Sequence, residues 1–186
     1  MSNPGFIVDG QMERLIINHF CSDRPVKLLN CNGKDVSLEA AAKHAASLIR
    51  LMKRNYPVIL IFDREKREET SEQIAEKLHE EIQKLGINDV ELIIGVPDKM
   101  IENWILADIN SVNLYFKVNA NQKNFEGTGG KSQIKQIINP KNYSETQDGP
   151  ELAKLCDITT VSKNSKSFRS FFDKLSKMRC VLTNIE

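Results

Sequence analysis

The stretch PVILIFDRE, residues 57–65, decides the fold of this chain. Its residues 58–62 are continuously apolar, which is typical of a strand covered on both faces. Further strand-like runs occupy residues 5–8, 26–31 (VKLLNC) and 90–96 (VELIIGV). The segments between these runs have helical periodicity, so the first 110 residues alternate strands with helices. This alternation predicts an α/β fold with a mostly parallel, Rossmann-like sheet flanked by helices.

Local signals place the helices between these strands. The segment after Gly10 carries Leu15, Ile16 and Phe20 at helical spacing. Ser37 is expected to cap a second helix, and TSEQ at residues 70–73 has the form of a capping box before a third. Asp98 is expected to cap a fourth.

The chain changes character after about residue 110, where Asn, Gln, Gly and Lys dominate the stretch 119–135. Short helical patterns follow over residues 131–138, 150–156 and 167–178. We therefore expect one domain over residues 1–186. It would consist of an α/β catalytic core (1–110) and a loop with a C-terminal helical extension (111–186).

The charge balance, the cysteine spacing and the lack of a long apolar run limit the classes of protein to which the chain can belong. Twenty-six Lys and Arg residues balance 25 Asp and Glu residues, so any nucleic-acid binding must depend on a local basic patch. The four cysteines, Cys21, Cys31, Cys156 and Cys180, lack the spacing of a zinc site. We expect a cytoplasmic protein with no membrane contact, because the chain shows neither a leader pattern nor a run of about 20 apolar residues.

Carboxylates follow three of the apolar runs. Asp9 and Glu13 come after the first, Asp63 and Glu65 after the third, and Glu102 after the fourth. Ligands of open α/β sheets bind at the carboxyl ends of the strands, so these acids are expected to converge there. Five acids at one edge would repel one another unless a divalent cation neutralised them. The pattern points to Mg²⁺-dependent phosphodiester chemistry.

Each cluster also has a purely structural interpretation. Asp9 could cap a helix with Glu13 as a first-turn acid. Asp63 and Glu65 could belong to a solvated charged turn, although period-2 alternation would put both on one side. Glu102 could face solvent from its helix. These alternatives stay open at the level of the sequence.

Two basic features accompany the acids. The loop GTGGK ending at Lys131 is not a Walker A motif, since Phe125 stands where the first glycine belongs. Lys131 could still neutralise a phosphate, or the loop could be a surface loop. The C-terminal segment could form a nucleic-acid track or a solvated helix face. Its basic residues are Lys163, Lys166, Arg169, Lys174, Lys177 and Arg179.

The ordered series IVDGQME, ILIFDREK, VPDKMIENWILADI and GGK resembles the Toprim-like family of small proteins called domain of unknown function 4276. The segments DGPELAKLCDI and TTVSKNSKSFRSFFDKL resemble the family's tail, in which Ser-x-Ser-Phe precedes an aromatic helix. The resemblance covers nearly the whole chain. It implies a Toprim catalytic core, similar to that of topoisomerases, primases and OLD-type nucleases.

The resemblance also implies roles for individual residues. The acid-Gly-x-x-Glu motif of the nucleases matches Asp9 and Glu13, the DxD motif matches Asp63 and Glu65, and a later helix acid and a nearby lysine match Glu102 and Lys131. By this analogy two divalent ions, Mg²⁺ or Mn²⁺, would clamp the attacking water and the leaving oxygen. Asp9 stands where the family's first motif has Glu, and Glu65 stands where its second motif has Asp. Each exchange keeps the charge and changes the reach of the carboxylate by about 1.5 Å.

The sequence therefore predicts a metal-dependent nuclease with nucleic acid as substrate, DNA in preference to RNA. Asp9, Asp63 and Glu65 would hold metal, while Glu13 and Glu102 would complete the shell. Resemblance implies a phage-defence or mobile-element context and a partner ATPase. The alternative is an inactive Toprim-like module that binds a partner protein or nucleic acid. A phosphotransfer domain is disfavoured, because the first strand lacks the acid pattern such domains need. The oligomeric state is left open.

Overall fold

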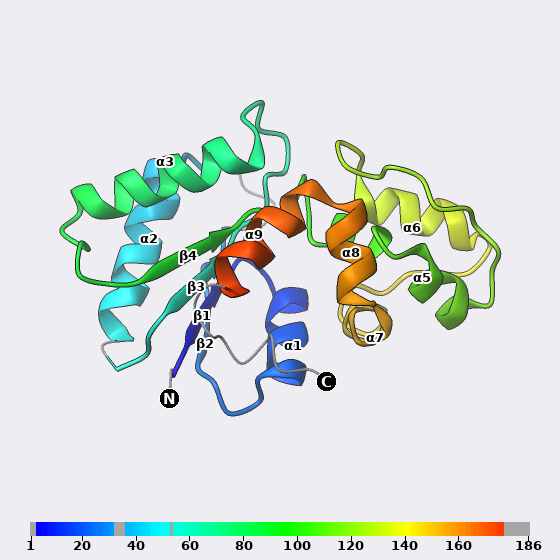
Figure 1. Cartoon of the computed structure of the whole chain (residues 1–186), viewed down its shortest axis with the longest axis horizontal. Coiled ribbons are helices and arrows are strands. Elements are labelled where there is room, and N and C mark those ends of the chain that lie inside the picture. Colours follow the sequence, from blue (N-terminus) through cyan, green and yellow to red (C-terminus); the bar gives the residue numbers. More distant parts are fainter. Residues whose placement is uncertain (1–2, 32–35, 53, 177–186) are drawn as a thin grey trace.

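The computed structural model describes residues 3–31, 36–52 and 54–176 (Figure 1). Its sheet has four parallel strands, which are β1 (Gly5–Val8), β2 (Val26–Leu28), β3 (Val58–Ile61) and β4 (Leu92–Gly95). Helices flank this sheet and further helices follow it. The predicted α/β class, with a Rossmann-like parallel sheet and a C-terminal helical extension, is confirmed.

The order of the strands is β2-β1-β3-β4. After β1 the chain moves outward to β2, and after β3 it moves outward in the other direction to β4. In register, Val8 lies beside Ile61, and Ile61 lies beside Gly95. The topological switch point of the sheet therefore lies between β1 and β3. Open α/β folds bind ligands in the crevice outside the carboxyl ends of such strands.

Alternating side chains of the strands enter two hydrophobic cores. Ile7, Leu60 and Phe62 pack on one face with α2 (Leu38–Leu51) and α3 (Ser71–Lys84). The opposite face, with Phe6 and Val8, packs against α1 (Gln11–Phe20) and the helices that follow β4. Burial of both faces explains why β3 is apolar throughout.

The expected caps of α2 and α3 are present. Ser37 Oγ accepts a hydrogen bond from the Ala40 N–H at 3.2 Å. Thr70 and Gln73 form the complete capping box, with both bonds between 2.9 and 3.2 Å. Gly86 follows α3 with φ +83°, a left-handed conformation that favours glycine at a helix end.

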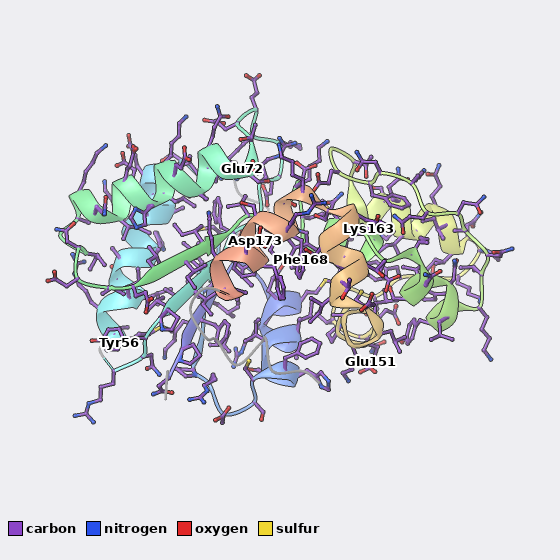
Figure 2. The ribbon with its side chains drawn as sticks, in the orientation of Figure 1. Tyr56, Glu72, Glu151, Lys163, Phe168 and Asp173 are labelled. Carbon is purple, nitrogen blue, oxygen red and sulfur yellow. The ribbon has the colours of Figure 1, made fainter. Side chains whose placement is uncertain are left out.

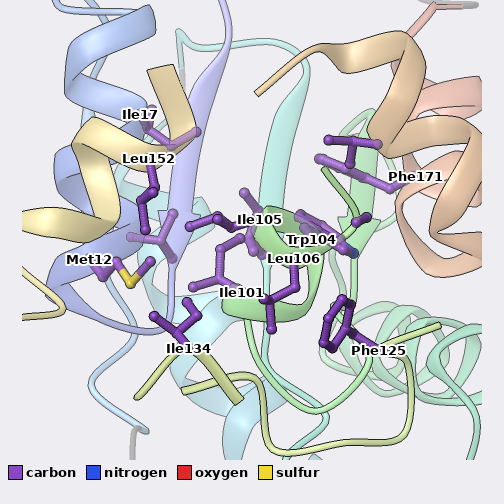
Figure 3. Close-up of a cluster of buried hydrophobic side chains, with 14 of the residues drawn as sticks. Met12, Ile17, Ile101, Trp104, Ile105, Leu106, Phe125, Ile134, Leu152 and Phe171 are labelled. Atoms are coloured by element: carbon purple, nitrogen blue, oxygen red, sulfur yellow. The ribbon is translucent and has the colours of Figure 1, made fainter. Parts of the chain in front are cut away.

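Six helices of the described chain follow β4. They are α4 (Glu102–Leu106), α5 (Ile109–Phe116), α6 (Gly130–Ile138), α7 (Asp148–Leu155), α8 (Ile158–Asn164) and α9 (Lys166–Ser176). The buried side chain of Trp104 on α4 contacts this extension, stacking on Phe171 of α9 with ring centroids 5.3 Å apart. Figure 3 shows α4 side chains between those of α1, α7 and α9. The extension and this face of the sheet thus share one hydrophobic core.

The structure differs from the sequence prediction in three local features. On α1, Met12 and Ile17 are buried whereas Leu15 and Phe20 are 37% and 36% exposed, so the helix is rotated relative to its most apolar stripe. Asp98 does not cap a helix; α4 begins later, and Asp98 pairs with Arg64 instead. Helices α5 and α8 were not predicted; the sequence of α8, ITTVSKN, is short and β-branched.

The basic tail lies on α8 and α9, where Figure 2 places Lys163 and Phe168 respectively. Lys163, Lys166, Arg169 and Lys174 are all exposed. Of the interleaved aromatic rings, Phe171 is buried, whereas Phe168 and Phe172 are half-buried. Rings buried in a core are not available to stack on bases. The predicted end of this helix and two of the basic residues, Lys177 and Arg179, lie outside the described residues.

No helix in the described part of the chain is both long and apolar enough to cross a membrane.

Candidate functional site

Asp9 and Glu13 come together at the carboxyl end of β1. Asp9 directly follows the strand and is 3% exposed, and Glu13 lies in the first turn of α1 and is 5% exposed. The Cys31 N–H donates to Asp9 Oδ1 at 3.2 Å, and the Asp63 N–H also donates to this carboxylate. The rotation of α1 described above points Glu13 inward, where the backbone N–H groups at the start of the helix donate to it.

Burial raises the pKa of both carboxyl groups. The pKa of Asp9 rises from 3.8 to about 6, chiefly through desolvation, with a further increase from the charge of Glu65. The pKa of Glu13 rises from 4.5 to about 7, again chiefly through desolvation and then through the charges of Glu102 and Asp9. Neither side chain is therefore a solvated surface acid.

Asp63 completes the switch point from the carboxyl side of β3. Its residue is partly buried, but its Oδ1 is shielded from solvent and has no hydrogen-bond partner. Glu13 Oε2 is likewise shielded from solvent and without a hydrogen-bond partner. The pKa of Asp63 lies well above 3.8. Desolvation is the largest cause, and the negative charges of Glu13 and Asp9 raise the pKa further. An unpartnered buried carboxylate oxygen is costly, so these two atoms demand a proton or a cation.

Glu65 is arranged differently from the sequence prediction. Strand β3 ends at Ile61, and Glu65 has φ +54°, so the predicted period-2 alternation does not extend from Asp63 to Glu65. The Glu65 N–H donates to Lys99 O at 2.7 Å, which joins the loops after β3 and β4. Its charge still raises the pKa of Asp9 and, as the weakest of four carboxylates, that of Asp63. Glu65 therefore lies at the margin of the cluster.

Glu102 faces this cluster from the start of α4, not solvent. It is 4% exposed, and the Tyr143 hydroxyl donates to its Oε1 at 3.4 Å. Desolvation raises its pKa, the charge of Glu145 raises it further, and the charge of Lys131 lowers it. Desolvation and the neighbouring Glu102 raise the pKa of Tyr143 as well, so its hydroxyl stays a donor.

The glycine-rich loop brings Lys131 to Glu102. A Cβ atom on Gly130 would lie 2.9 Å from both Asn103 N and Glu102 Cβ, so only glycine lets this backbone approach α4 so closely. Lys131 Nζ forms an ion pair with Glu145 Oε1. The loop therefore packs closely against α4 and places the Lys131 ammonium beside Glu145.

Strained backbone residues lie in the loops at this edge of the sheet. Asn30, Glu65 and Lys99 follow β2, β3 and β4 respectively, and each has φ between +54° and +69°. Left-handed non-glycine residues persist only where surrounding contacts stabilise them, and they are frequent at functional sites. Arg67 joins the loop after β3 to the segment before α2, donating to Val36 O at 2.7 Å and to Asp63 O at 3.3 Å.

The carboxylates of the cluster are suitable ligands for a divalent cation, although they do not form a complete coordination site by themselves. Among the described residues, no three His, Cys, Asp or Glu side chains form a ready-made metal-binding group. Mg²⁺ commonly uses one or two carboxylates and takes its remaining ligands from water and substrate phosphate. The unpartnered oxygens of Glu13 and Asp63 meet that requirement. The predicted metal roles of Asp9, Glu13, Asp63, Glu65 and Glu102 stay predictions.

A separate cavity of about 400 Å³ lies at the opposite, amino end of the strands. Its lining is mainly apolar and includes Ile49, Met52, Val58 and Val90. None of the acids of the switch point borders it. Its lining includes Arg50 and Tyr56 but no carboxylate or histidine, so the carboxyl edge remains the candidate site.

Three residues of the site were not identified from the sequence. Tyr143 and Glu145 belong to the polar segment between α6 and α7, which has no periodicity to signal burial. Arg67 lies in the charged run after β3, and its charge lowers the pKa of Asp9. A run of alternating charges is ordinarily solvated, so nothing in the pattern distinguished this arginine.

A model of the family described as "Domain of unknown function (DUF4276)" matches residues 10–176. The chain belongs to this family. The matched range includes Glu13, Asp63, Glu102 and Lys131 of the DUF4276 protein, whereas Asp9 falls one residue before it. No curated protein and no solved structure matches the chain.

Proposed function

We propose that this DUF4276 protein is a divalent-metal-dependent nuclease that hydrolyses phosphodiester bonds of nucleic acid, with Mg²⁺ or Mn²⁺ as cofactor. The observation that carries the proposal is the pair of buried, unpartnered oxygens Glu13 Oε2 and Asp63 Oδ1 beside Asp9. Their position at the switch point of a parallel sheet is where such folds bind ligands.

In this proposal Asp9, Glu13 and Asp63 hold the metal, and Glu65 supports them from the margin. The bound metal supplies Lewis-acid polarisation of the phosphate and a nucleophilic water at neutral pH. Lys131 contributes a positive charge that stabilises negative charge developing on the phosphate oxygens. Tyr143 orients Glu102 by its hydrogen bond.

A relationship to the Toprim and OLD-type nucleases is part of the proposal. It is supported by the order of the acids along the chain, with one group after β1, one after β3 and one on the helix after β4. The same resemblance supports DNA in preference to RNA as substrate, a role in phage defence or in a mobile element, and a partner ATPase. Exposed basic side chains on α8 and α9 offer a surface for the phosphate backbone.

The test is cleavage of plasmid DNA, linear DNA and RNA with Mg²⁺ or Mn²⁺, comparing wild type with Asp63→Asn. The control is Asp89→Asn, the same chemical change at an exposed residue before β4. We expect the control to cut like wild type and Asp63→Asn to lose cleavage while keeping its circular dichroism spectrum. Undiminished cleavage by Asp63→Asn would disprove the assignment of the site.

The second candidate function is a non-catalytic module that binds a partner protein or nucleic acid. The exposed basic residues of α8 and α9 favour it, because they could bind phosphate without any metal. Retention of DNA in EDTA, together with no cleavage in any metal, would support this function. Loss of that retention in Lys163→Ala with Lys166→Ala would locate the binding surface.

A further inference from the structure

Two basic side chains act on the cluster of carboxylates: the charge of Arg67 lowers the pKa of Asp9, and the charge of Lys131 lowers that of Glu102. On the α4 side, Glu102 accepts a hydrogen bond from Tyr143, and Lys131 lies close enough to lower its pKa. On the β1 and β3 side, Glu13 Oε2 and Asp63 Oδ1 are buried and have no hydrogen-bond partner. The unmet demand for a cation is therefore confined to one half of the cluster.

Lys131 is held on the α4 side by its backbone as well as by its charge. Gly130 packs directly on Glu102 and Asn103, and the Lys131 N–H contacts Met100 Sδ at 3.3 Å. Asn103 is buried, and its Nδ2 donates to Phe125 O at 2.7 Å, which fixes the start of the same loop. The Lys131 side chain thus begins from a position set by α4.

The Lys131 ammonium then lies between two carboxylates. It is ion-paired with Glu145, and it interacts electrostatically with Glu102. A lysine ammonium in this place neutralises the acids that a second metal ion would need, and it repels such an ion. The side chains of Lys131 and Glu145 are 39% and 44% exposed, so solvent ions have access to the pair.

We propose that Lys131 is the built-in second cation of this site, so that the protein binds one divalent ion, through Asp9, Glu13 and Asp63, and not two. The inference rests on the proposed function, since it concerns the metal stoichiometry of the same site. It differs from the two-ion arrangement that the family resemblance implies.

The test is titration of the full chain with Mn²⁺, followed by calorimetry for stoichiometry and by electron paramagnetic resonance for coupling between ions. We expect one Mn²⁺ per wild-type chain, with the spectrum of an isolated ion. Lys131→Met should bind two, the second more weakly, and should show a coupled pair. Lys135→Met, an exposed lysine one turn further along α6, should bind one.

Two coupled ions in wild type would overturn the inference and leave the proposed function standing. One ion in Lys131→Met would also overturn it, because the lysine would not be what excludes the second ion. No Mn²⁺ binding by wild type would remove the metal site itself, and the proposed function with it. If Lys131→Met fails to fold, Lys131→Arg decides: one ion supports the inference and two ions contradict it.

Discussion

Replacing Glu13 by glutamine should stabilise the metal-free protein at alkaline pH. The pKa of Glu13 is raised from 4.5 to about 7, so the folded state holds this proton more tightly than the unfolded state does. The stabilisation from that proton is complete below pH 4.5 and is lost as the pH rises through 7. Glutamine has a similar shape and stays neutral throughout, so the variant avoids this loss.

The size of this stability change follows from the rise in the pKa of Glu13. About 2.5 pKa units at 1.36 kcal/mol each correspond to a loss of about 3 kcal/mol between pH 4 and pH 8. The free energy of unfolding of Glu13→Gln, relative to wild type, should therefore rise by about 3 kcal/mol over this interval. For a chain of this length the same change corresponds to roughly 6–12 °C in Tm.

The assay is urea unfolding in EDTA at pH 4 and pH 8, with Glu76→Gln as control. Glu76 is exposed on α3, so its variant should follow wild type at both pH values. The reasoning is refuted if the difference between Glu13→Gln and wild type is the same at the two pH values, or is smaller at pH 8. Either result would mean that Glu13 is not confined in a buried cluster of acids.

Three further results are expected. Mg²⁺ or Mn²⁺ at about 100 times its Kd should stabilise wild type by about 2.7 kcal/mol at pH 7.5, measured by thermal unfolding, and should leave Asp63→Asn unchanged. Gly130→Ala should lose about 1–3 kcal/mol in urea unfolding because its Cβ meets α4 at 2.9 Å, whereas Gly129→Ala, with 3.6 Å to the nearest atom, should stay close to wild type. Phe171→Ala should cost about 3–5 kcal/mol, and a loss below 1 kcal/mol, comparable with Phe20→Ala at the surface, would contradict its place in the core.

The sheet was predictable because β1, β3 and β4 are buried on both faces over most of their length and therefore have unbroken apolar sequences. Once the strands are parallel, the residues that follow them must meet at one edge, which is how Asp9 and Asp63 could be paired across 54 positions. Helix caps at Ser37 and Thr70 were predictable for another reason, since their hydrogen bonds span only three residues.

The features of the fold and the site that were not predicted depend on long-range contacts, which leave no local pattern in the sequence. The inward face of α1 was not predictable, because Leu15 and Phe20 compete with Met12 and Ile17 for burial, and packing against α7 and the sheet decides the outcome. Tyr143 reaches Glu102 from 41 residues away through a segment without periodicity. Such long-range polar contacts are set by the tertiary fold alone.

Trp104 is the only tryptophan of the chain, and its position makes it a built-in optical reporter. Its indole N–H donates to Ser167 Oγ at 2.9 Å on the C-terminal helix, and Glu102 of the candidate site lies two residues before it. Its emission therefore responds both to unfolding of the extension and to rearrangement beside the carboxylates. Metal titrations and unfolding curves can be followed through one native fluorophore, without any label that would disturb the protein.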